Sequence, residues 1–360
     1  MFSKTRLTVA RQRALLTKKE LAQRIGVDPR AVSGFEAGQY IPTDENIAKI
    51  ARATGYPKEF FFADDIDIPS ADGVSFRSMT KMTSRQRDAA VAAGAIAYLL
   101  IDWVENLFDL PETDLPDLRE DAPEIAALTL RQHWGLGERP IRNMVHLLEA
   151  KGVRVFSLAE NCAEVDAYSV WRGKRPCVFL NVGKSSERRR FDAAHELGHL
   201  VLHKHAAPSG LDAEKEANAF ASAFLMPEAG MKATGRVASL DKIIAAKKKW
   251  CVSVAAMTYR LHELGLMTKW HYQTLYMEIS RRGWRSKEPY EARNETSQIW
   301  QKVFAALRNE GVGIQGLADR LFVPADELVK LVFGLVTLGL PSGNRGTNTA
   351  SRTPNLRVVG

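Results

Sequence analysis

The feature that most constrains this chain is the sequence His195-Glu196-Leu197-Gly198-His199. Residues four apart share one face of an α-helix, so two imidazoles at this spacing can bind one metal ion if the stretch is helical. Zinc suits such ligands, because it accepts nitrogen and oxygen donors and is a Lewis acid without redox chemistry. It would acidify a bound water, and Glu196 would take the proton as general base. The alternative is an amphipathic helix with surface histidines.

A catalytic zinc site takes a third protein ligand, and the chain offers three candidates. The favoured one is Glu214, on the next expected helix, with Asn218 one turn later on the same face to support a ligating histidine. Glu216 points to another side of that helix. His205 has the spacing of a longer histidine motif, but that motif needs a glycine where this chain has Leu202.

The segments around the motif predict an α+β fold that is mostly helical. Short runs rich in Val, Phe, Tyr and Trp predict strands, and polar caps with apolar periodicity predict helices. The expected strands are 152–157, 165–171 and 176–181, and the expected helices near them are 124–134, 141–151, 187–204 and 212–226. The fold is therefore expected to combine an N-terminal helix-turn-helix bundle, a central domain with a small sheet, and a C-terminal helical region.

The first 62 residues are expected to form a compact helical unit. Thr17 and Glu20 make a capping box that begins its second helix. Gly26 ends that helix, and Asp28 caps the third. Two capped helices joined by a three-residue turn have the spacing of a helix-turn-helix.

This unit has the charge expected of a module that binds duplex DNA. It holds 11 Lys and Arg against 6 Asp and Glu, a net +5 of the chain's total of +8. Arg30 and Ser33 are expected to face bases, whereas Gly34 on the same outward face contacts none. Lys18 and Lys19 begin the preceding helix, where side chains and backbone N–H groups meet phosphates. A module that contacts only proteins is the alternative.

Composition and segment lengths predict a cytoplasmic protein. The longest uncharged run, 89–101, is shorter than the roughly 20 residues that span a bilayer, so no membrane partner is expected. No apolar stretch follows the N-terminal charges as in a signal peptide. Three cysteines cannot build a disulfide framework, which fits a reducing compartment.

The chain is expected to divide into five segments. They are a helix-turn-helix module at 1–65, a linker with a long helix at 66–118, a zinc-binding domain at 119–230, a helical domain at 231–338 and a disordered tail at 339–360. No internal repeat of solenoid period is seen.

Four stretches keep two interpretations each. The linker 63–80 is acidic and bears proline, so it is either a flexible spacer or a site of self-cleavage. The long helix at 84–107 is expected to support a homodimer or to form an interdomain core. The basic and aromatic stretches 247–250 and 281–285 either contact nucleic acid or are solvated faces. The length of 360 residues is typical of a chain with about two domains.

Residues 3–62 resemble the Cro/repressor-like (XRE) helix-turn-helix family. The resemblance rests on the segment LTKKELAQRIGVDPRAVSGFEAG and the Ile-Pro that follows it. It implies binding of double-stranded DNA, with Gly34 departing from the longer polar side chain that the family commonly carries there.

Residues 119–227 resemble the ImmA/IrrE family of zinc peptidases, through the segments DAYSVW, PCVFLN, RRRFDAAHELGHLVLH and EKEANAFASAFLMP. The resemblance implies a zincin-like, gluzincin-type site with His195, His199 and Glu214 as zinc ligands and Glu196 as catalytic base. It also implies a helix-turn-helix repressor as protein substrate, cut to control prophage, mobile-element or stress genes. Cleavage in trans is favoured over cleavage of 63–80. The alternative is a DNA-binding sensor whose metallo-domain binds a partner or ligand without hydrolysis.

Overall fold

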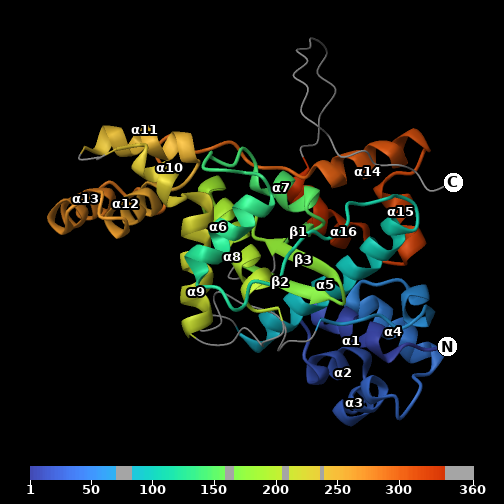
Figure 1. Cartoon of the computed structure of the whole chain (residues 1–360). Helices are drawn as coiled ribbons and strands as arrows, with labels where there is room; N and C mark the ends of the chain where they lie inside the picture. Colours follow the sequence, from blue (N-terminus) through green and yellow to red (C-terminus); the bar gives the residue numbers. More distant parts are fainter. Residues whose placement is uncertain (70–82, 159–165, 205–210, 236–238, 337–360) are drawn as a thin grey trace, which may run out of the picture.

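The computed structural model describes residues 1–69, 83–158, 166–204, 211–235 and 239–336 (Figure 1). Over these ranges the chain is mostly helical, with one three-stranded sheet near its centre, which confirms the expected α+β class. No described helix is long and apolar enough to cross a lipid bilayer. The expected disordered tail and the third-ligand candidate His205 lie outside the described residues.

The N-terminal bundle begins and ends its helices at the residues whose side chains cap them. The Thr17 hydroxyl accepts a hydrogen bond from Glu20 N at 3.1 Å, and the Glu20 carboxylate accepts one from Thr17 N at 2.7 Å. Gly26 and Gly38 end their helices at a φ of +75°, which glycine adopts without strain. The elements are α1 (Lys4–Arg13), α2 (Lys18–Ile25), α3 (Pro29–Ala37), α4 (Asp44–Thr54) and the 3₁₀ turn η1 (Lys58–Phe62).

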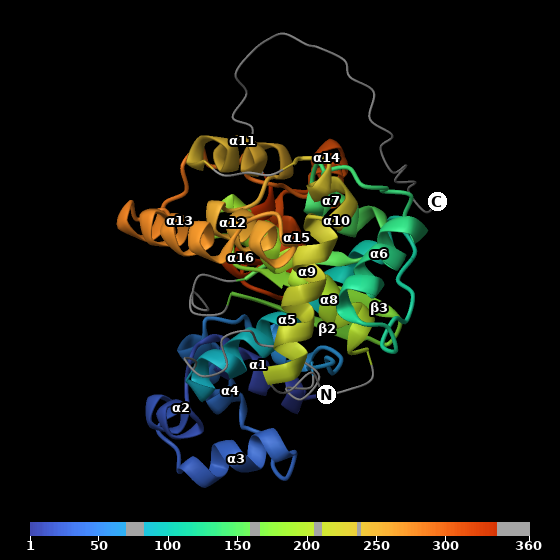
Figure 2. The same ribbon diagram turned by 60° about the vertical axis from the view of Figure 1, so that its left-hand side comes forward.

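Helix α5 (Ser84–Glu105) lies between this bundle and the sheet in both views of the chain (Figures 1 and 2). Nearly all its central residues are buried within this one chain. The Tyr168 hydroxyl, fully buried, donates to the Ala90 carbonyl of α5 at 2.9 Å. The helix therefore forms an interdomain core, the second of the two roles expected for it.

The sheet has the order β1-β3-β2, from strands β1 (Arg154–Ser157), β2 (Ala167–Arg172) and β3 (Arg175–Leu180). Strand β1 pairs with β3 in parallel, and β2 pairs with β3 as an antiparallel hairpin. The helices around it are α6 (Pro123–His133), α7 (Met144–Ala150), α8 (Ser186–Leu202), α9 (Leu211–Leu225) and α10 (Glu228–Lys232). Helix α8 packs on β2 and β3 and on α9, which puts the histidine motif at the centre of the molecule.

The C-terminal region is helical except for residues 282–297, which correct the expectation of helix throughout. This irregular segment pairs its polar groups with other elements: Lys247 donates to the carbonyls of Pro289 and Tyr290, and Glu295 accepts from Met144 N at 2.9 Å. The helices are α11 (Leu240–Trp250), α12 (Val254–Glu263), α13 (Lys269–Arg281), α14 (Gln298–Asn309), α15 (Ile314–Leu321) and α16 (Ala325–Val332), followed by the 3₁₀ turn η4 (Phe333–Leu335).

The two basic and aromatic stretches are each partly engaged within the chain. In 247–250, the Lys247 side chain is 1% exposed and pairs with Glu187 at 2.7 Å, and Trp250 is buried, whereas Lys248 and Lys249 are exposed. In 281–285, Arg281 and Arg282 both pair with Glu278. The two interpretations of each stretch stay predictions.

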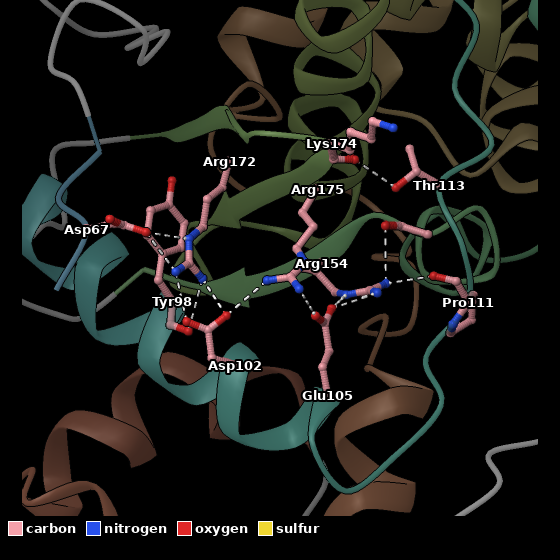
Figure 3. Close-up of polar contacts among 11 residues, drawn as sticks. Asp67, Tyr98, Asp102, Glu105, Pro111, Thr113, Arg154, Arg172, Lys174 and Arg175 are labelled. Carbon is pink, nitrogen blue, oxygen red and sulfur yellow. Dashed lines mark hydrogen bonds and ion pairs between the residues drawn. The ribbon is translucent and has the colours of Figure 1, made fainter. Parts of the chain in front are cut away.

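The first part of the expected flexible linker, residues 63–69, is held against the rest of the chain. Figure 3 shows the Arg172 guanidinium between the carboxylates of Asp67 and Asp102, each at 2.8 Å. At the bundle end, Asp65 accepts from the Ser3 hydroxyl at 2.5 Å. These contacts correct the expectation of a free spacer for residues 63–69, and residues 70–80 lie outside the described part of the chain.

Gly152, at the turn from α7 into β1, gives a test of this packing. Its φ is +78°, and a Cβ there would lie 2.2 Å from the Glu112 carbonyl oxygen. We expect Gly152→Ala to lower the free energy of unfolding by about 3 kcal/mol, from left-handed strain plus overpacking. The matched control Gly265→Ala has a φ of +68° and no neighbour within 4 Å, so it should cost about 1 kcal/mol. Urea unfolding measures both, and equal costs would contradict the close approach.

Candidate functional site

Helix α8 positions the two histidines of the motif. It begins at Ser185, whose hydroxyl accepts from Arg188 N at 3.3 Å, and it continues past the motif to Leu202. His195 and His199 are buried, and their Nε2 atoms lie 3.1 Å apart. Both rings therefore present a nitrogen to the same point.

Glu214, on α9, completes a group of three candidate ligands. One carboxylate oxygen lies 3.4 Å from His195 Nε2, and the other lies 3.4 Å from His199 Nε2. One ligand atom from each of the three residues lies within 4.8 Å of the others, which is close enough for all three to bind one ion. Zinc takes such nitrogen and oxygen donors. Among the described residues these three form the cluster that could hold a metal ion.

A close approach of α8 to α9 makes this convergence possible. A Cβ at Gly198 would lie 3.0 Å from the Phe220 ring and 3.3 Å from the Ala217 Cα. Glycine at this position lets the two helices pack closely, with Phe220 fully buried between them. The glycine of the motif therefore acts on geometry and not on chemistry.

Glu214 is ionised in this arrangement. Burial by itself would raise its pKa, but hydrogen bonds with His195 and His199 outweigh burial and hold the pKa well below that of an ordinary glutamic acid. A metal ligand must be deprotonated, and the carboxylate meets this condition at neutral pH.

Side chains behind the two histidines fix their orientation. The Asn218 amide oxygen lies 3.2 Å from His195 Nδ1. An amide oxygen only accepts, so with a metal on Nε2 the Nδ1–H would donate to Asn218. His199 Nδ1 lies 3.0 Å from His203 Nδ1, and His203 Nε2 lies 2.8 Å from Glu216. Sequence reasoning predicted a supporting role for Asn218 but missed this second relay, whose signal was a histidine one turn after His199.

Glu196, the expected base, follows His195 on α8 and is fully buried. The Ser169 hydroxyl donates to its Oε2 at 2.7 Å. Ser169 lies on β2 beside the buried Tyr168, which stacks on Phe179 in the core. Sequence reasoning gave Ser169 no role, because only the packing of α8 on β2 brings it to the motif.

The expected DNA-binding residues share the exposed surface of α2 and α3. Arg30, Ser33, Lys18 and Lys19 are all exposed. Asp28 caps α3 by accepting from Arg30 N at 2.7 Å, which directs the helix N-terminus outward. Lys18 lies 3.2 Å from the Glu36 carboxylate yet keeps 47% of its side chain exposed.

Gly34 is not on the outward surface, as sequence reasoning placed it, but lies beneath Tyr40. A Cβ at Gly34 would lie 2.3 Å from the Tyr40 ring. The ring therefore takes the space that a side chain at this position would need, and 60% of it remains exposed beside α3. Tyr40 becomes a further candidate for DNA contact that sequence reasoning missed.

Comparison with known proteins matches both parts of this arrangement. Residues 9–61 match the helix-turn-helix family model, and residues 148–262 match the IrrE N-terminal-like domain of a peptidase family. The chain joins a helix-turn-helix domain to an IrrE-like peptidase-family domain. The first match runs from the second half of α1 through α4, and the second covers the sheet, α8 and α9 with the candidate ligands.

Part of the chain is also similar to multiprotein-bridging factor 1 of Candida albicans, to which it is 44% identical over 46 residues. The similarity covers 13% of this chain and 30% of that relative, so it concerns a short segment of each protein.

Metal content tests the ligand set of the IrrE-like domain. We expect about one zinc per chain, lost in His195→Ala and in Glu214→Gln because a ligand is removed, and retained in Glu196→Gln. Asn218→Ala should weaken zinc binding about 10- to 100-fold. Asp212→Asn, an exposed change on α9, is the control that keeps zinc. Metal analysis after dialysis measures this, and stoichiometric zinc in a His195→Ala/His199→Ala variant would contradict the site.

Salt-dependent binding tests the helix-turn-helix domain. Arg30→Ala should weaken binding to a specific duplex by about 1–3 kcal/mol if the side chain contacts a base. Lys19→Ala should weaken binding to all duplexes alike and reduce the salt slope by about 1. Lys269→Ala, exposed at the first residue of α13, is the control. Fluorescence anisotropy at several salt concentrations measures all three, and unchanged affinity after removal of residues 1–65 would refute this assignment.

Proposed function

We propose that the chain is a cytoplasmic DNA-binding transcriptional regulator whose IrrE-like domain is a zinc-dependent endopeptidase. Its substrate is a helix-turn-helix repressor that it cleaves in trans, which relieves repression of prophage, mobile-element or stress genes. The observation that carries the enzymatic part is the spacing of the three donor groups, 3.1 to 3.4 Å apart, with the buried Glu196 next to His195 in the sequence.

Each residue of the site has a defined task in this proposal. His195, His199 and Glu214 hold zinc, which supplies a Lewis acid for the scissile carbonyl and the attacking water. Glu196 removes a proton from that water and delivers it to the leaving amine. Ser169 donates to the Glu196 carboxylate at 2.7 Å and so fixes its orientation.

The contacts of residues 63–69 support cleavage in trans. Asp67 is held by Arg172 and Asp65 by Ser3, and the Asp64 carbonyl accepts from Arg6 at 2.5 Å. An endopeptidase binds its substrate as a segment that is free of other contacts. The contacts of residues 63–69 would therefore have to break before this segment could bind in the active site. A separate repressor meets no such cost.

Intact-mass measurement over time tests the proposal. The zinc-loaded chain is mixed with a helix-turn-helix repressor encoded beside it, and Glu196→Gln is the inactive control. We expect the repressor to be cut by the unaltered chain only. Ser169→Ala should lower the rate about tenfold while zinc content stays constant.

Two other outcomes would replace the proposal. Loss of an N-terminal fragment near 63–80 that requires Glu196 would establish self-cleavage. Intact masses for the chain and every candidate repressor, with zinc bound, would favour a DNA-binding sensor whose metallo-domain binds a partner without hydrolysis.

A further inference from the structure

The last three described helices repeat the first three with a constant offset in the sequence. Helix α15 (Ile314–Leu321) corresponds to α2 (Lys18–Ile25), and the number of each residue is that of its counterpart plus 296. The same offset takes the first residue of α3, Pro29, to the first residue of α16, Ala325, and the last residue of α1, Arg13, to the last residue of α14, Asn309. We call α14 to α16 the C-terminal triplet.

The turn between the two central helices also repeats. Gly26 and its counterpart Phe322 both have a positive φ, +75° and +54°. Val27 N donates to the Ala22 carbonyl at 3.0 Å, and Val323 N donates to the Ala318 carbonyl at 3.0 Å. The earlier turn repeats as well, with Leu15 and Gly311 both at positive φ.

Several buried positions of the two units correspond. Four apolar residues in the core of the N-terminal bundle have apolar, buried counterparts in the triplet, whereas Ala305 and Leu321, the counterparts of Val9 and Ile25, are more exposed. The pairs are Leu7 and Val303, Leu21 and Leu317, Ala22 and Ala318, and Val32 and Leu328, all at most 1% exposed. The triplet is therefore a second helix-turn-helix in geometry and core. A counterpart of α4 would fall at 340–350, outside the described residues.

The triplet lacks the side chains expected to bind DNA in the first unit. Asp326 stands where the first unit has Arg30, and Ile314 and Gln315 stand where it has Lys18 and Lys19. Residues 298–335 carry 4 Lys and Arg against 4 Asp and Glu, a net charge of zero, whereas residues 1–62 carry +5. A neutral surface lacks the phosphate attraction that supplies most non-specific affinity.

The start of α16 contacts protein on a different side of the helix from the one that faces DNA in α3. Asp326 and Val329, the counterparts of Arg30 and Ser33, are exposed, whereas Glu327, the counterpart of Ala31, forms an ion pair with Arg13 at the end of α1. The side chains of this pair are 10% and 1% exposed, and Arg13 also donates to the Ala89 carbonyl of α5 at 3.0 Å. Removing one partner of such a buried pair leaves the other uncompensated, so this contact ties the triplet to the N-terminal bundle.

The triplet is tied to the IrrE-like domain on its other side. Trp300 Nε1 of α14 donates to the Val155 carbonyl of β1 at 2.8 Å. The Ser157 hydroxyl of β1 donates to the Lys330 carbonyl of α16, and Glu149 of α7 accepts from Gln298 N at 2.9 Å. The unpaired side of β1 is thus covered by the triplet, which contacts both domains at once.

We propose that residues 298–335 are a second helix-turn-helix module that binds protein in place of DNA. Its partner is the N-terminal DNA-binding bundle of the same chain, held through Glu327 and Arg13. The module fixes the DNA-binding bundle to the IrrE-like domain, so that the two move as one unit. This inference does not depend on whether the IrrE-like domain hydrolyses a substrate.

Hydrogen–deuterium exchange of the full chain tests the contact. Glu327→Gln should raise exchange at the end of α1 and in α16 at least about tenfold. Asp326→Asn, an exposed neighbour with the same change of charge, is the matched control and should leave exchange there unchanged. Unchanged exchange in Glu327→Gln would overturn the proposal.

The unaltered chain supplies a second test that no folding defect can obscure. In exchange experiments over a denaturant series, α1 and α16 should lose protection over the same range of concentration, as parts of one cooperative unit. Loss of protection in α1 at a concentration that leaves α16 intact would overturn the proposal.

Measurement of duplex affinity tests whether the C-terminal triplet lacks DNA binding. Lys330→Ala removes the basic residue of α16 and should change duplex affinity less than about twofold, whereas Arg30→Ala should lower it about tenfold or more. An equal loss from both variants would show that the triplet binds DNA and would overturn the proposal.

Discussion

The close contact between α8 and α9 is the constraint on which the rest of the site depends. Without a side chain at Gly198, the two helices approach until Phe220 fills the space between them. This approach brings Glu214 to the two histidines and Asn218 behind one of them. A methyl group at Gly198 would lie 3.0 Å from the Phe220 ring and 3.3 Å from the Ala217 Cα, so α9 or its side chains would have to shift by a few tenths of an ångström. The geometry of the candidate metal site thus depends on helix packing.

Ion pairs link the segments around this centre. Arg172 joins the segment after the N-terminal bundle to α5 (Figure 3), Arg13 joins the bundle to α16, and Lys247 joins α11 to the start of α8. The Arg13 and Lys247 pairs are buried, so they add little net stability compared with apolar packing, but breaking one is costly because a charge is left in a poorly solvated place. They therefore favour one relative placement of the domains over others.

The two helix-turn-helix units show how one fold can have two different binding partners. In the first unit, the start of α3 carries the exposed Arg30. In the second unit, the start of α16 carries Glu327, whose side chain is buried against Arg13. Fold sets the shape of the surface, whereas a few side chains decide what it binds. In the proposed arrangement, a DNA-binding unit and a peptidase-family domain are joined by a copy of the former.

Local chemistry let the sequence alone determine the first helix-turn-helix and the histidine pair. Thr17, Glu20 and Gly26 act within one or two turns, and the spacing of His195 and His199 is a property of any helix. The second unit lacks the local signals of the first helix-turn-helix, because Gly313 offers no capping side chain to α15 and Phe322 takes the left-handed position that Gly26 takes in the first unit. The contacts of three further residues are made between distant segments or beyond the end of a helix. These residues are Ser169, His203 and Tyr40. Tertiary structure decided these, since packing free energy depends on which surfaces meet, and no local pattern records that.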